Sequence, residues 1–334
     1  MKAFVLAGGF ATRLWPLTEK RAKPLLPLAG KPLLTHLVEK IPEGIPITVS
    51  TNAVFAVDFE NWKSQVSSLK SQVSILIEDA GHEGEKLGAL GAVAKWVREE
   101  KIHEDVLLLA GDNYIGFSIE EFLKEYRSHP LLAAYDIRDK EKARQLGTVV
   151  AEGKNVRAFE EKPQSPRSTL VSTGCLVLPA NSLVELTAFA KEKPDNIGGV
   201  FEHFLKIGTP IECIAFTEPW FDIGSFEAYL EATKALVGDK VLDGGFQYTS
   251  IPKQSSGGTS VAQENGNQFV GSVVLGKGSS VRKSTLKNVV LFENCAIEDC
   301  ILENCILDNG CVLQGVDLTG KMLRENTTLI RNTS

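Results

Sequence analysis

A short repeat in the last part of the chain restricts its possible folds more than any other feature of the sequence. From about residue 268, an aliphatic residue, polar residues and then a small Cys, Val or Ser recur about every five or six positions, as in Ile297-Glu-Asp-Cys and Ile301-Leu-Glu-Asn-Cys. A period of this kind is typical of a parallel β-helix, in which each coil has three short faces. We therefore predict such a β-helix over residues 268–334.

Four of the six cysteines follow this repeat, at spacings of five, five and six residues. No two cysteines have the CxxC spacing that is typical of zinc sites and redox centres. Because a buried thiol behaves as a small apolar group, we expect reduced cysteines stacked inside the coils. A metal site is the alternative explanation of the clustered set, which is Cys295, Cys300, Cys305 and Cys311.

Residues 1–237 follow a different pattern, in which short apolar runs alternate with longer amphipathic segments. This alternation predicts an α/β fold with a largely parallel sheet and helices on both faces. We expect strands at 3–6, 47–50, 74–78, 106–110, 131–136, 148–151, 158–161, 175–178 and 211–216, and helices at 33–40, 55–69, 90–99, 119–128, 182–191, 200–206 and 226–236. Residues 238–267, rich in Gly, Ser, Gln, Asn and Thr, are predicted to be a linker.

Composition excludes several classes of function. A length of 334 residues predicts about two domains. The net charge of -6 and the sequence pI near 5.6 argue against general nucleic-acid binding, which needs a basic surface. No apolar stretch approaches the roughly 18 to 20 residues of a membrane span, and Met1-Lys2 leads directly into a strand-like run. We therefore expect a cytoplasmic protein with small-molecule partners, no membrane and no nucleic acid.

The first predicted strand ends at a glycine pair, Gly8-Gly9, and no acidic residue follows before Glu19. Glycines let backbone amides approach phosphate oxygens closely, and prolines hold the following loop in shape. Arg13 and Lys23 add charged hydrogen-bond donors. This arrangement predicts a cradle for a polyphosphate.

Two acidic residues are predicted near the same edge of the sheet, where ligands of such folds bind. Asp112 follows the strand 106–110, and Asp222 precedes the helix 226–236. Since carboxylates beside a polyphosphate repel it unless a cation lies between them, we predict bound Mg²⁺. The alternatives are a plain turn at Asp112 and helix capping near Asp222 by Gly224 or Ser225.

A lysine and two glycine sites complete the predicted site. Lys162 ends Phe159-Glu-Glu-Lys, where it faces either a second anionic ligand or only a proline-fixed turn. Gly88 and Gly147 each precede a predicted helix or strand. Taken together, these loops are suited to transfer a nucleotidyl group from a triphosphate to a phosphate nucleophile.

The chain resembles the sugar-1-phosphate nucleotidylyltransferases, also called NDP-sugar pyrophosphorylases. The resemblance rests on an ordered series over residues 1–237: LAGGFATRLWPLT, KPLLPLAGKP, LGALG, AGDN, LGTVV, FEEKP, STGCLVL and PWFDIGS. It implies a Rossmann-like nucleotidyltransferase (GT-A-like) catalytic domain at 1–237 and a left-handed β-helix at 268–334. It also implies that a sugar 1-phosphate attacks the α-phosphorus of an NTP in line and releases pyrophosphate.

The resemblance assigns roles to individual residues. Arg13, Lys23 and Lys162 would be catalytic, with Lys162 on the sugar phosphate, and Mg²⁺ would bind Asp112 and Asp222. The nucleotide would contact Leu6, Ala7, Gly8, Gly9, Thr12, Arg13, Lys23, Glu83, Gly88 and Asp112. The sugar phosphate would contact Gly147, Glu161, Lys162, Thr173 and Gly174.

Two positions affect this interpretation. Ala11 replaces a glycine of the family loop; alanine at positive φ would cost about 1 to 2 kcal/mol, so we expect an ordinary φ there. Glu83 falls where a glutamine often reads a pyrimidine. A carboxylate only accepts hydrogen bonds, which favours GTP as the nucleotide, with mannose 1-phosphate as the sugar substrate. Backbone groups at Gly88 could bind any base, so UTP or dTTP with glucose 1-phosphate remains the alternative.

Other functions remain as alternatives. Some bifunctional relatives carry a tail acyltransferase that uses a histidine base, but all five histidines precede residue 204. We therefore expect the tail to assemble a homo-oligomer or to regulate. A non-catalytic regulatory paralogue would be expected to lack Arg13, Asp112, Lys162 or Asp222, and all four are present. A Rossmann dehydrogenase would need a GxGxxG loop, which the sequence lacks.

Overall fold

The computed structural model describes residues 1–67, 71–80, 82, 84, 87–244, 261–264 and 266–331. These form two compact units that do not follow the chain order: the first comprises Met1–Phe10 and Leu34–Asp222, and the second Ala11–Leu33 and Ile223–Ser334. The predicted boundary after residue 237 follows sequence composition and remains a prediction. Part of the predicted linker lies outside the described residues.

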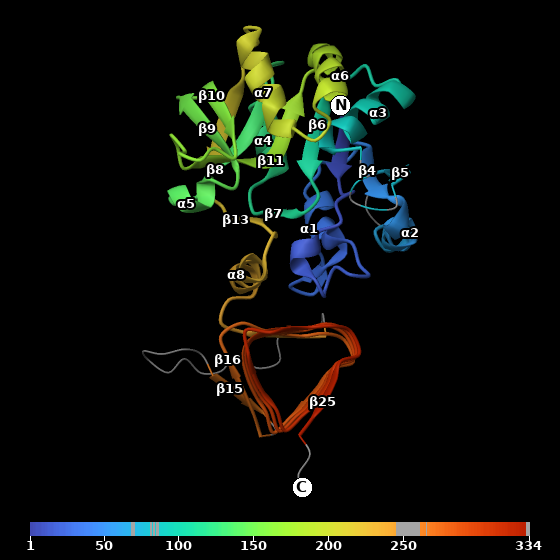
Figure 1. The fold of residues 1–334 in the computed structure, drawn as a ribbon, viewed down its shortest axis with the longest axis vertical. Coiled ribbons are helices and arrows are strands. Elements are labelled where there is room, and N and C mark those ends of the chain that lie inside the picture. Colours follow the sequence, from blue (N-terminus) through green and yellow to red (C-terminus); the bar gives the residue numbers. More distant parts are fainter. Residues whose placement is uncertain are drawn as a thin grey trace. The chain divides into compact units, whose positions relative to one another are not determined.

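The first unit is built on a mixed sheet of nine strands, in the order β5-β4-β1-β6-β11-β8-β12-β10-β9 (Figure 1). All nine predicted strands are present: β1 (Lys2–Leu6), β4 (Ile47–Asn52), β5 (Val73–Glu78), β6 (Val106–Ala110), β8 (Leu131–Asp136), β9 (Gly147–Glu152), β10 (Asn155–Glu161), β11 (Leu170–Leu178) and β12 (Glu212–Phe216). From β5 to β6 the sheet is parallel, as predicted. Beyond β6 it is mixed, because β11 returns antiparallel to both β6 and β8.

The predicted helices are also present, with small shifts at their ends. They are α1 (Leu33–Val38), α2 (Ala56–Gln65), α3 (Ala89–Glu99), α4 (Ile119–Lys124), α6 (Leu183–Glu192), α7 (Ile197–Lys206) and α8 (Phe226–Val237). The short α5 (Lys140–Ala143) was not predicted. Among the described residues, no helix is long and apolar enough to span a membrane.

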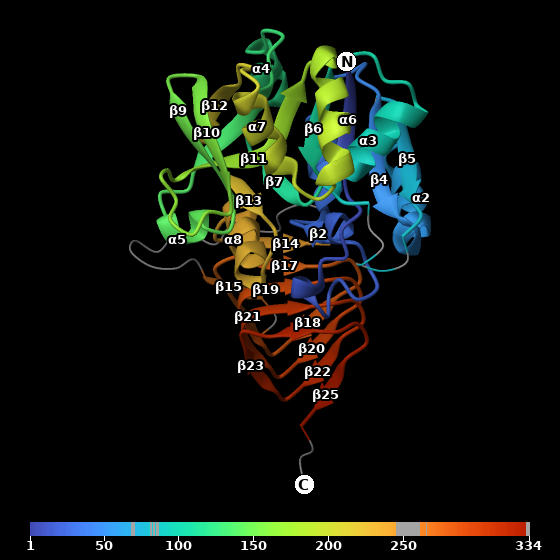
Figure 2. The ribbon, with the colours of Figure 1, turned by 45° about the horizontal axis from the view of Figure 1, so that its top comes forward.

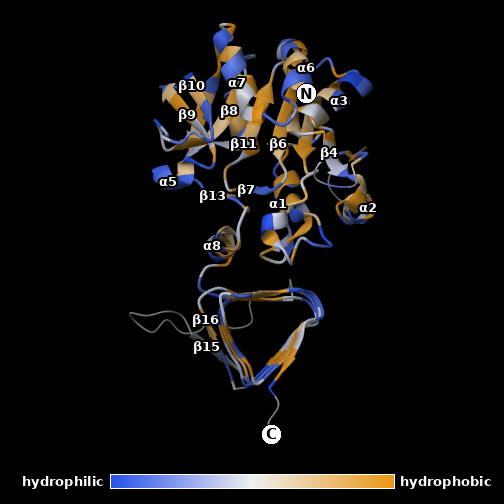
Figure 3. Ribbon diagram, in the orientation of Figure 1, coloured by the Kyte–Doolittle hydropathy of each residue, from blue (hydrophilic) through white to orange (hydrophobic). Residues whose placement is uncertain are grey.

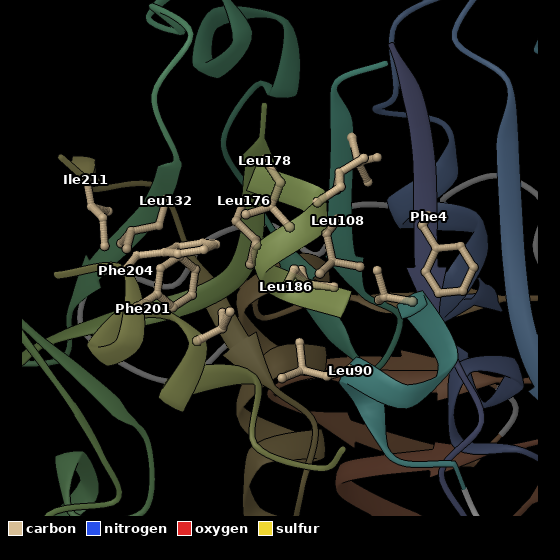
Figure 4. Packing of buried hydrophobic residues seen from close by; sticks show 14 of the residues in the cluster. Phe4, Leu90, Leu108, Leu132, Leu176, Leu178, Leu186, Phe201, Phe204 and Ile211 are labelled. Atoms are coloured by element: carbon tan, nitrogen blue, oxygen red, sulfur yellow. The ribbon is translucent and has the colours of Figure 1, made fainter. Parts of the chain in front are cut away.

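One apolar core joins the sheet to three of these helices. Phe201 and Phe204 of α7, with Leu186 of α6 and Leu90 of α3, pack against strand residues such as Leu132 (Figure 4). Figure 3 shows hydrophobic residues along β6 and β11, whereas α5 is hydrophilic. Burial of this kind fixes the strands, and therefore the loops at their carboxyl ends, in place.

In the second unit the described residues from β14 (Val241–Asp243) onward form stacked coils with a triangular cross-section (Figures 1 and 2). Its other strands are β15 (Val261–Glu264), β16 (Asn267–Val270), β17 (Val273–Leu275), β18 (Ser280–Arg282), β19 (Thr285–Leu291), β20 (Ala296–Glu298), β21 (Ile301–Leu307), β22 (Val312–Gln314), β23 (Asp317–Thr319), β24 (Met322–Leu323) and β25 (Thr328–Ile330). Ala296 pairs in parallel with both Ser280 and Val312, which sets a coil of 16 residues. Three faces of five or six residues make such a coil, as the repeat predicted.

The clustered cysteines lie inside the coils, as expected for small apolar side chains. All are buried and unlinked by disulfides, and they belong to a core with Leu286, Leu302 and Leu313. Their thiols donate to backbone carbonyls, for example Cys300 Sγ to Glu298 O at 3.1 Å. The spacing of five, five and six residues is therefore explained by the faces of the coil.

Candidate active site

The glycine loop after β1 is held by the neighbouring strands of the first unit. The amide of Ala7 donates to the Ser50 carbonyl at 3.1 Å, and Asn52 Nδ2 donates to the Gly8 carbonyl at the same distance. On the other side, the Gly111 amide donates to the Leu6 carbonyl at 2.8 Å. The loop that carries Asp112 therefore starts directly beside the glycine loop, as the shared sheet edge predicted.

Of the two predicted metal ligands, Asp222 ends a short strand and Asp112 directly precedes the strand that pairs with it. β7 (Asn113–Ile115) and β13 (Trp220–Asp222) pair antiparallel, with Asp222 opposite Asn113 and thus next to Asp112. The side-chain Nδ2 of Asn113 donates a hydrogen bond to Asp112 Oδ1 at 2.9 Å. Among the described residues, the buried Oδ1 of Asn113 has no hydrogen-bond partner. Two carboxylates and an amide oxygen are oxygen ligands of the kind that Mg²⁺ accepts.

The described part of the chain contains no group of three or more His, Cys, Asp or Glu side chains placed to hold a metal ion. A cation at Asp112 and Asp222 would therefore need further oxygens from water or from a ligand. Mg²⁺ normally keeps waters and binds one or two carboxylates together with phosphates. The donor set thus fits Mg²⁺ that arrives with a nucleotide.

Glu161 is held between two glycines on the sugar side of the predicted site. In the β9–β10 pair, Glu161 stands opposite Gly147. A Cβ added at Gly147 would lie 3.2 Å from Glu161 Oε2, and one added at Gly198 of α7 would lie 2.1 Å from it. A side chain at Gly198 would therefore displace the carboxylate, and one at Gly147 would first meet the Phe159 ring, at 2.5 Å. The ammonium of Lys162 lies 3.6 Å from Glu161 Oε1 and is 67% exposed, open to an anionic ligand.

Thr173 and Gly174 of β11 lie against the middle of β8 and the end of β6, respectively. The Thr173 hydroxyl donates to the Ala133 carbonyl at 2.9 Å, and Trp220 Nε1 donates to the Thr173 carbonyl at 3.1 Å. Gly174 has φ 72°, and a Cβ there would lie 2.6 Å from that of Ala110. This segment packs beside the loop of Asp112, where the resemblance places the sugar.

Gly88 caps α3 in a backbone conformation that favours glycine, with φ 76°. A Cβ there would lie 2.5 Å from the carbonyl oxygen of Pro194. That same oxygen accepts hydrogen bonds from the backbone N–H groups of Leu90 and Gly91, so these two donors of the first turn of α3 are already hydrogen-bonded within the protein. Glu83, predicted to read the base, lies outside the described residues.

The remaining predicted phosphate ligands, Thr12, Arg13 and Lys23, belong to the second unit. They lie in two short 3-10 helices, Thr12–Leu14 and Lys23–Leu25. The expectation of an ordinary φ at Ala11 was wrong: its φ is 49° and its ψ 45°, in the left-handed region. The Thr18 hydroxyl donates to the Ala11 carbonyl at 2.7 Å and helps to hold this conformation.

Sequence reasoning missed Glu78, the last residue of β5. Its side chain is 4% exposed, and its Oε1 would lie 2.9 Å from a Cβ added at Gly8. Burial raises the pKa of Glu78, and the Leu87 backbone N–H and the Lys95 charge oppose the rise. An acid at the end of the predicted strand 74–78, on the edge that carries the glycine loop, was the signal that could have identified it.

Known proteins are similar to this chain in sequence and in fold. The chain is 29% identical to the bifunctional protein GlmU of Methanocaldococcus jannaschii over 72% of its own length and 55% of that protein. It is 26% identical to the mannose-1-phosphate guanylyltransferase of Mycobacterium tuberculosis, over 88% of this chain and 80% of that protein. A solved Bacillus anthracis structure described as a "Putative Glucose-1-Phosphate Thymidylyltransferase" shares the fold, with a TM-score of 0.62 at 20% identity over 70% of this chain and 94% of that one.

The family model for nucleotidyl transferases matches residues 2–238. This range covers the glycine loop, Asp112, Asp222 and the end of β10 at Glu161. The chain therefore belongs to the nucleotidyl transferase family.

Proposed function

We propose that the protein is a sugar-1-phosphate nucleotidylyltransferase, which converts an NTP and a sugar 1-phosphate to an NDP-sugar and pyrophosphate. The observation that carries this proposal is the β7–β13 pairing, in which Asp222 lies opposite Asn113, the residue that follows Asp112. Because Gly111 also bonds to Leu6, this acidic pair adjoins the glycine loop. Relatives named as mannose-1-phosphate guanylyltransferase and GlmU support the same substrate class.

In this mechanism the chain binds and orients two anionic substrates. Backbone amides of Gly8 and Gly9, together with Arg13 and Lys23, hold the triphosphate, and Lys162 holds the sugar phosphate. Asp112 and Asp222 would hold Mg²⁺, which neutralises phosphate charge when bound. A phosphate oxygen of the sugar then displaces pyrophosphate from the α-phosphorus. Positioning and charge neutralisation provide most of the acceleration in such transfers.

The proposed nucleotide is GTP and the proposed sugar is mannose 1-phosphate. Glu83 supports the base, since a carboxylate accepts the N1–H and 2-amino donors of guanine. Several relatives of this chain carry mannose-1-phosphate guanylyltransferase in their names. UTP or dTTP with glucose 1-phosphate is the competing pair, supported by the Bacillus anthracis structure's description.

A matrix of four NTPs and dTTP against mannose, glucose and N-acetylglucosamine 1-phosphates, read by pyrophosphate release, tests the proposal. We expect the highest kcat/KM with GTP and mannose 1-phosphate, and no release without Mg²⁺. A preference for UTP or dTTP would overturn the assigned base. No release with any pair would overturn the transferase proposal, and saturable binding of a nucleotide sugar would then favour a regulatory paralogue.

The tail is proposed to assemble a homo-oligomer in the cytoplasm. Val312 and Ile330 lie on neighbouring strands of one face, β22 and β25, and are 38% and 53% exposed. Exposed aliphatic residues on one face are suited to bury against another copy. Sedimentation analysis of the wild type and of Val312→Ser/Ile330→Ser tests this: a monomeric wild type would contradict the proposal.

A further inference from the structure

Three consecutive residues of the loop that follows Arg13 form ion pairs with the tail, all within the second unit. Glu19 Oε2 lies 3.1 Å from Arg324 Nε, and Lys20 Nζ lies 2.5 Å from Glu325 Oε1. Next to them, Arg21 Nη1 donates to Asp308 Oδ1 at 3.1 Å. These six side chains line a small pocket. The positive and negative side chains of this pocket are equal in number and are paired with one another. The pocket is therefore suited to hold the loop in place, and its lining favours neither an anionic nor a cationic ligand.

Among the three pairs, Arg21–Asp308 is the one withdrawn from water. The side chain of Asp308 is 6% exposed and that of Arg21 22%, whereas Lys20 is 70% and Arg324 63% exposed. Water screens exposed ion pairs so that they contribute little, but a sheltered acid that loses its partner is strongly disfavoured. The guanidinium of Arg21 also lies over the Phe292 ring, 5.4 Å from its centroid. Arg21 is therefore fixed in both position and orientation.

Asp308 is in turn fixed by the stacking of the coils. Its backbone N–H donates to Leu323 O at 3.1 Å in the next coil, and its carbonyl accepts the Cys295 thiol at 3.2 Å from the preceding one. Its carboxylate also accepts the amide of Asn309 at 2.7 Å. The β-helix thus presents this carboxylate on a rigid support.

The segment fixed by this pair contains Lys23. Arg21 lies two residues before Lys23, which is itself 6% exposed. Beyond Lys23, the carbonyl of Pro27 accepts the hydroxyl of Tyr229 on α8. The backbone of Lys23 is therefore anchored on both sides by elements of the same unit, at Arg21 and at Pro27.

We propose that Asp308, acting through Arg21, is a positioning residue for nucleotidyl transfer. It holds the segment of Lys23, and with it the loop of Arg13, in the conformation that binds the triphosphate and the leaving pyrophosphate. The inference rests on the proposed function and adds a role for the tail in it. Lys162 and Glu161, which face the sugar phosphate in the proposed mechanism, belong to the other unit and do not depend on this pair.

The test is steady-state kinetics of full-length Asp308→Asn in both reaction directions. We expect the KM for NTP and for pyrophosphate to rise about tenfold or more, because misplaced binding groups lose affinity and rate, while the KM for sugar 1-phosphate stays within about twofold. Arg21→Met should behave like Asp308→Asn, and the double variant should lose no more than either single one. Arg21→Lys, which keeps the charge, should restore part of the affinity.

Glu303→Gln is the matched control on the tail. It removes the exposed Lys287–Glu303 pair of 2.6 Å and should change no KM. A merely structural role of Asp308 would lower the melting temperature and the amount of active enzyme but leave both KM values unchanged, which would overturn the proposal. An equal rise in the KM for sugar 1-phosphate would also overturn it. A wild type without transferase activity would overturn the proposed function itself, before any variant is compared.

Discussion

Ala11 occupies a backbone conformation that glycine adopts at lower cost. With φ 49° and ψ 45°, its Cβ is crowded by the following carbonyl, at a cost of about 1 to 2 kcal/mol. Glycine at this position removes this cost, but it also increases the conformational entropy of the unfolded chain, which lowers the net gain in stability. Ala11→Gly should therefore raise the free energy of unfolding by up to about 1 kcal/mol, measured by denaturant titration.

Ala22 provides the matched control in the same loop. Its φ is −62° and its ψ 138°, which any residue adopts, so Ala22→Gly should lower the free energy of unfolding by about 0.5–1 kcal/mol. Equal destabilisation by both substitutions would contradict the strain assigned to Ala11. Sequence comparison identified Ala11 as the unusual position, but its φ could not be predicted, because the Thr18 hydroxyl that holds it is a tertiary contact.

Glu78 predicts a pH dependence of stability. Burial raises its folded-state pKa above the ordinary 4.5, so its ionisation opposes folding. The stability that the neutral Glu78 side chain contributes is fully present below pH 4.5 and is lost as the pH rises through the pKa of the folded state. Glu78→Gln should therefore raise the melting temperature at pH 7 to 8 and have little effect near pH 4.

Glu125 is a control of opposite sign. A hydrogen bond and the charge of Lys154 lower the pKa of Glu125, so its stabilisation is present above the unfolded pKa and is lost as pH falls. Glu125→Gln should slightly lower the melting temperature at neutral pH and have no effect in acid. If Glu78→Gln lowered the melting temperature at neutral pH and had no effect in acid, burial would not be the main influence on the pKa of Glu78.

At the scale of elements, the pairing of β7 with β13 sets Asp222 opposite Asn113, the residue that follows Asp112. Asp112→Asn and Asp222→Asn should each lower Mg²⁺-dependent pyrophosphate release by about a hundredfold or more, as expected for loss of charge stabilisation in an active site. The isosteric change should leave the melting temperature unchanged. Titration of activity with Mg²⁺ and with Mn²⁺ should show a raised metal requirement.

Glu60→Gln serves as the control for these variants, since Glu60 pairs with Lys63 at 3.1 Å on the exposed surface of α2. It should leave turnover and metal requirement unchanged. Full activity of both aspartate variants would remove the proposed metal site.

The elements themselves show how far sequence patterns reach. The nine sheet strands were predicted because runs such as Val106–Ala110 are apolar and bounded by turn residues. β7 and β13 were not, because a strand of three residues carries too little periodicity to be distinguished from a turn. Asp112 could be chosen from its place after a predicted strand and Asp222 from its place before a predicted helix, but the pairing of β7 with β13 depends on a register that only the fold defines.

At the scale of the whole molecule, the membership of residues 11–33 in the unit of the tail could not be predicted. The Arg21–Asp308 bond joins residues 287 positions apart, and no local pattern encodes such a contact. The coils, in contrast, were predicted because each repeat has the same interior pattern. Local sequence patterns thus predicted the α/β sheet and the β-helix. The packing of the loop of Arg13 and Lys23 with the β-helix in the second unit depends on tertiary contacts.

Destabilising the tail should therefore impair the loop that carries Arg13 and Lys23. Leu302 is 0% exposed and stacks between Leu286 and Leu318 of the neighbouring coils. Leu302→Ala should lower the free energy of unfolding by about 2–5 kcal/mol through the cavity it leaves, and coil stability depends on such neighbour contacts. We expect pyrophosphate release to be lost on heating at the same lowered temperature as the β-structure seen by circular dichroism.

The adjacent Ile301 is the matched control, because it lies on the same strand but is 56% exposed. Ile301→Ala should change the free energy of unfolding by no more than about 0.5 kcal/mol and leave the temperature of inactivation unchanged. Activity that outlasts the unfolding of the coils in Leu302→Ala would show that Arg13 and Lys23 keep their places without the tail. Loss of both together would show that the second unit, loop and coils, unfolds as one.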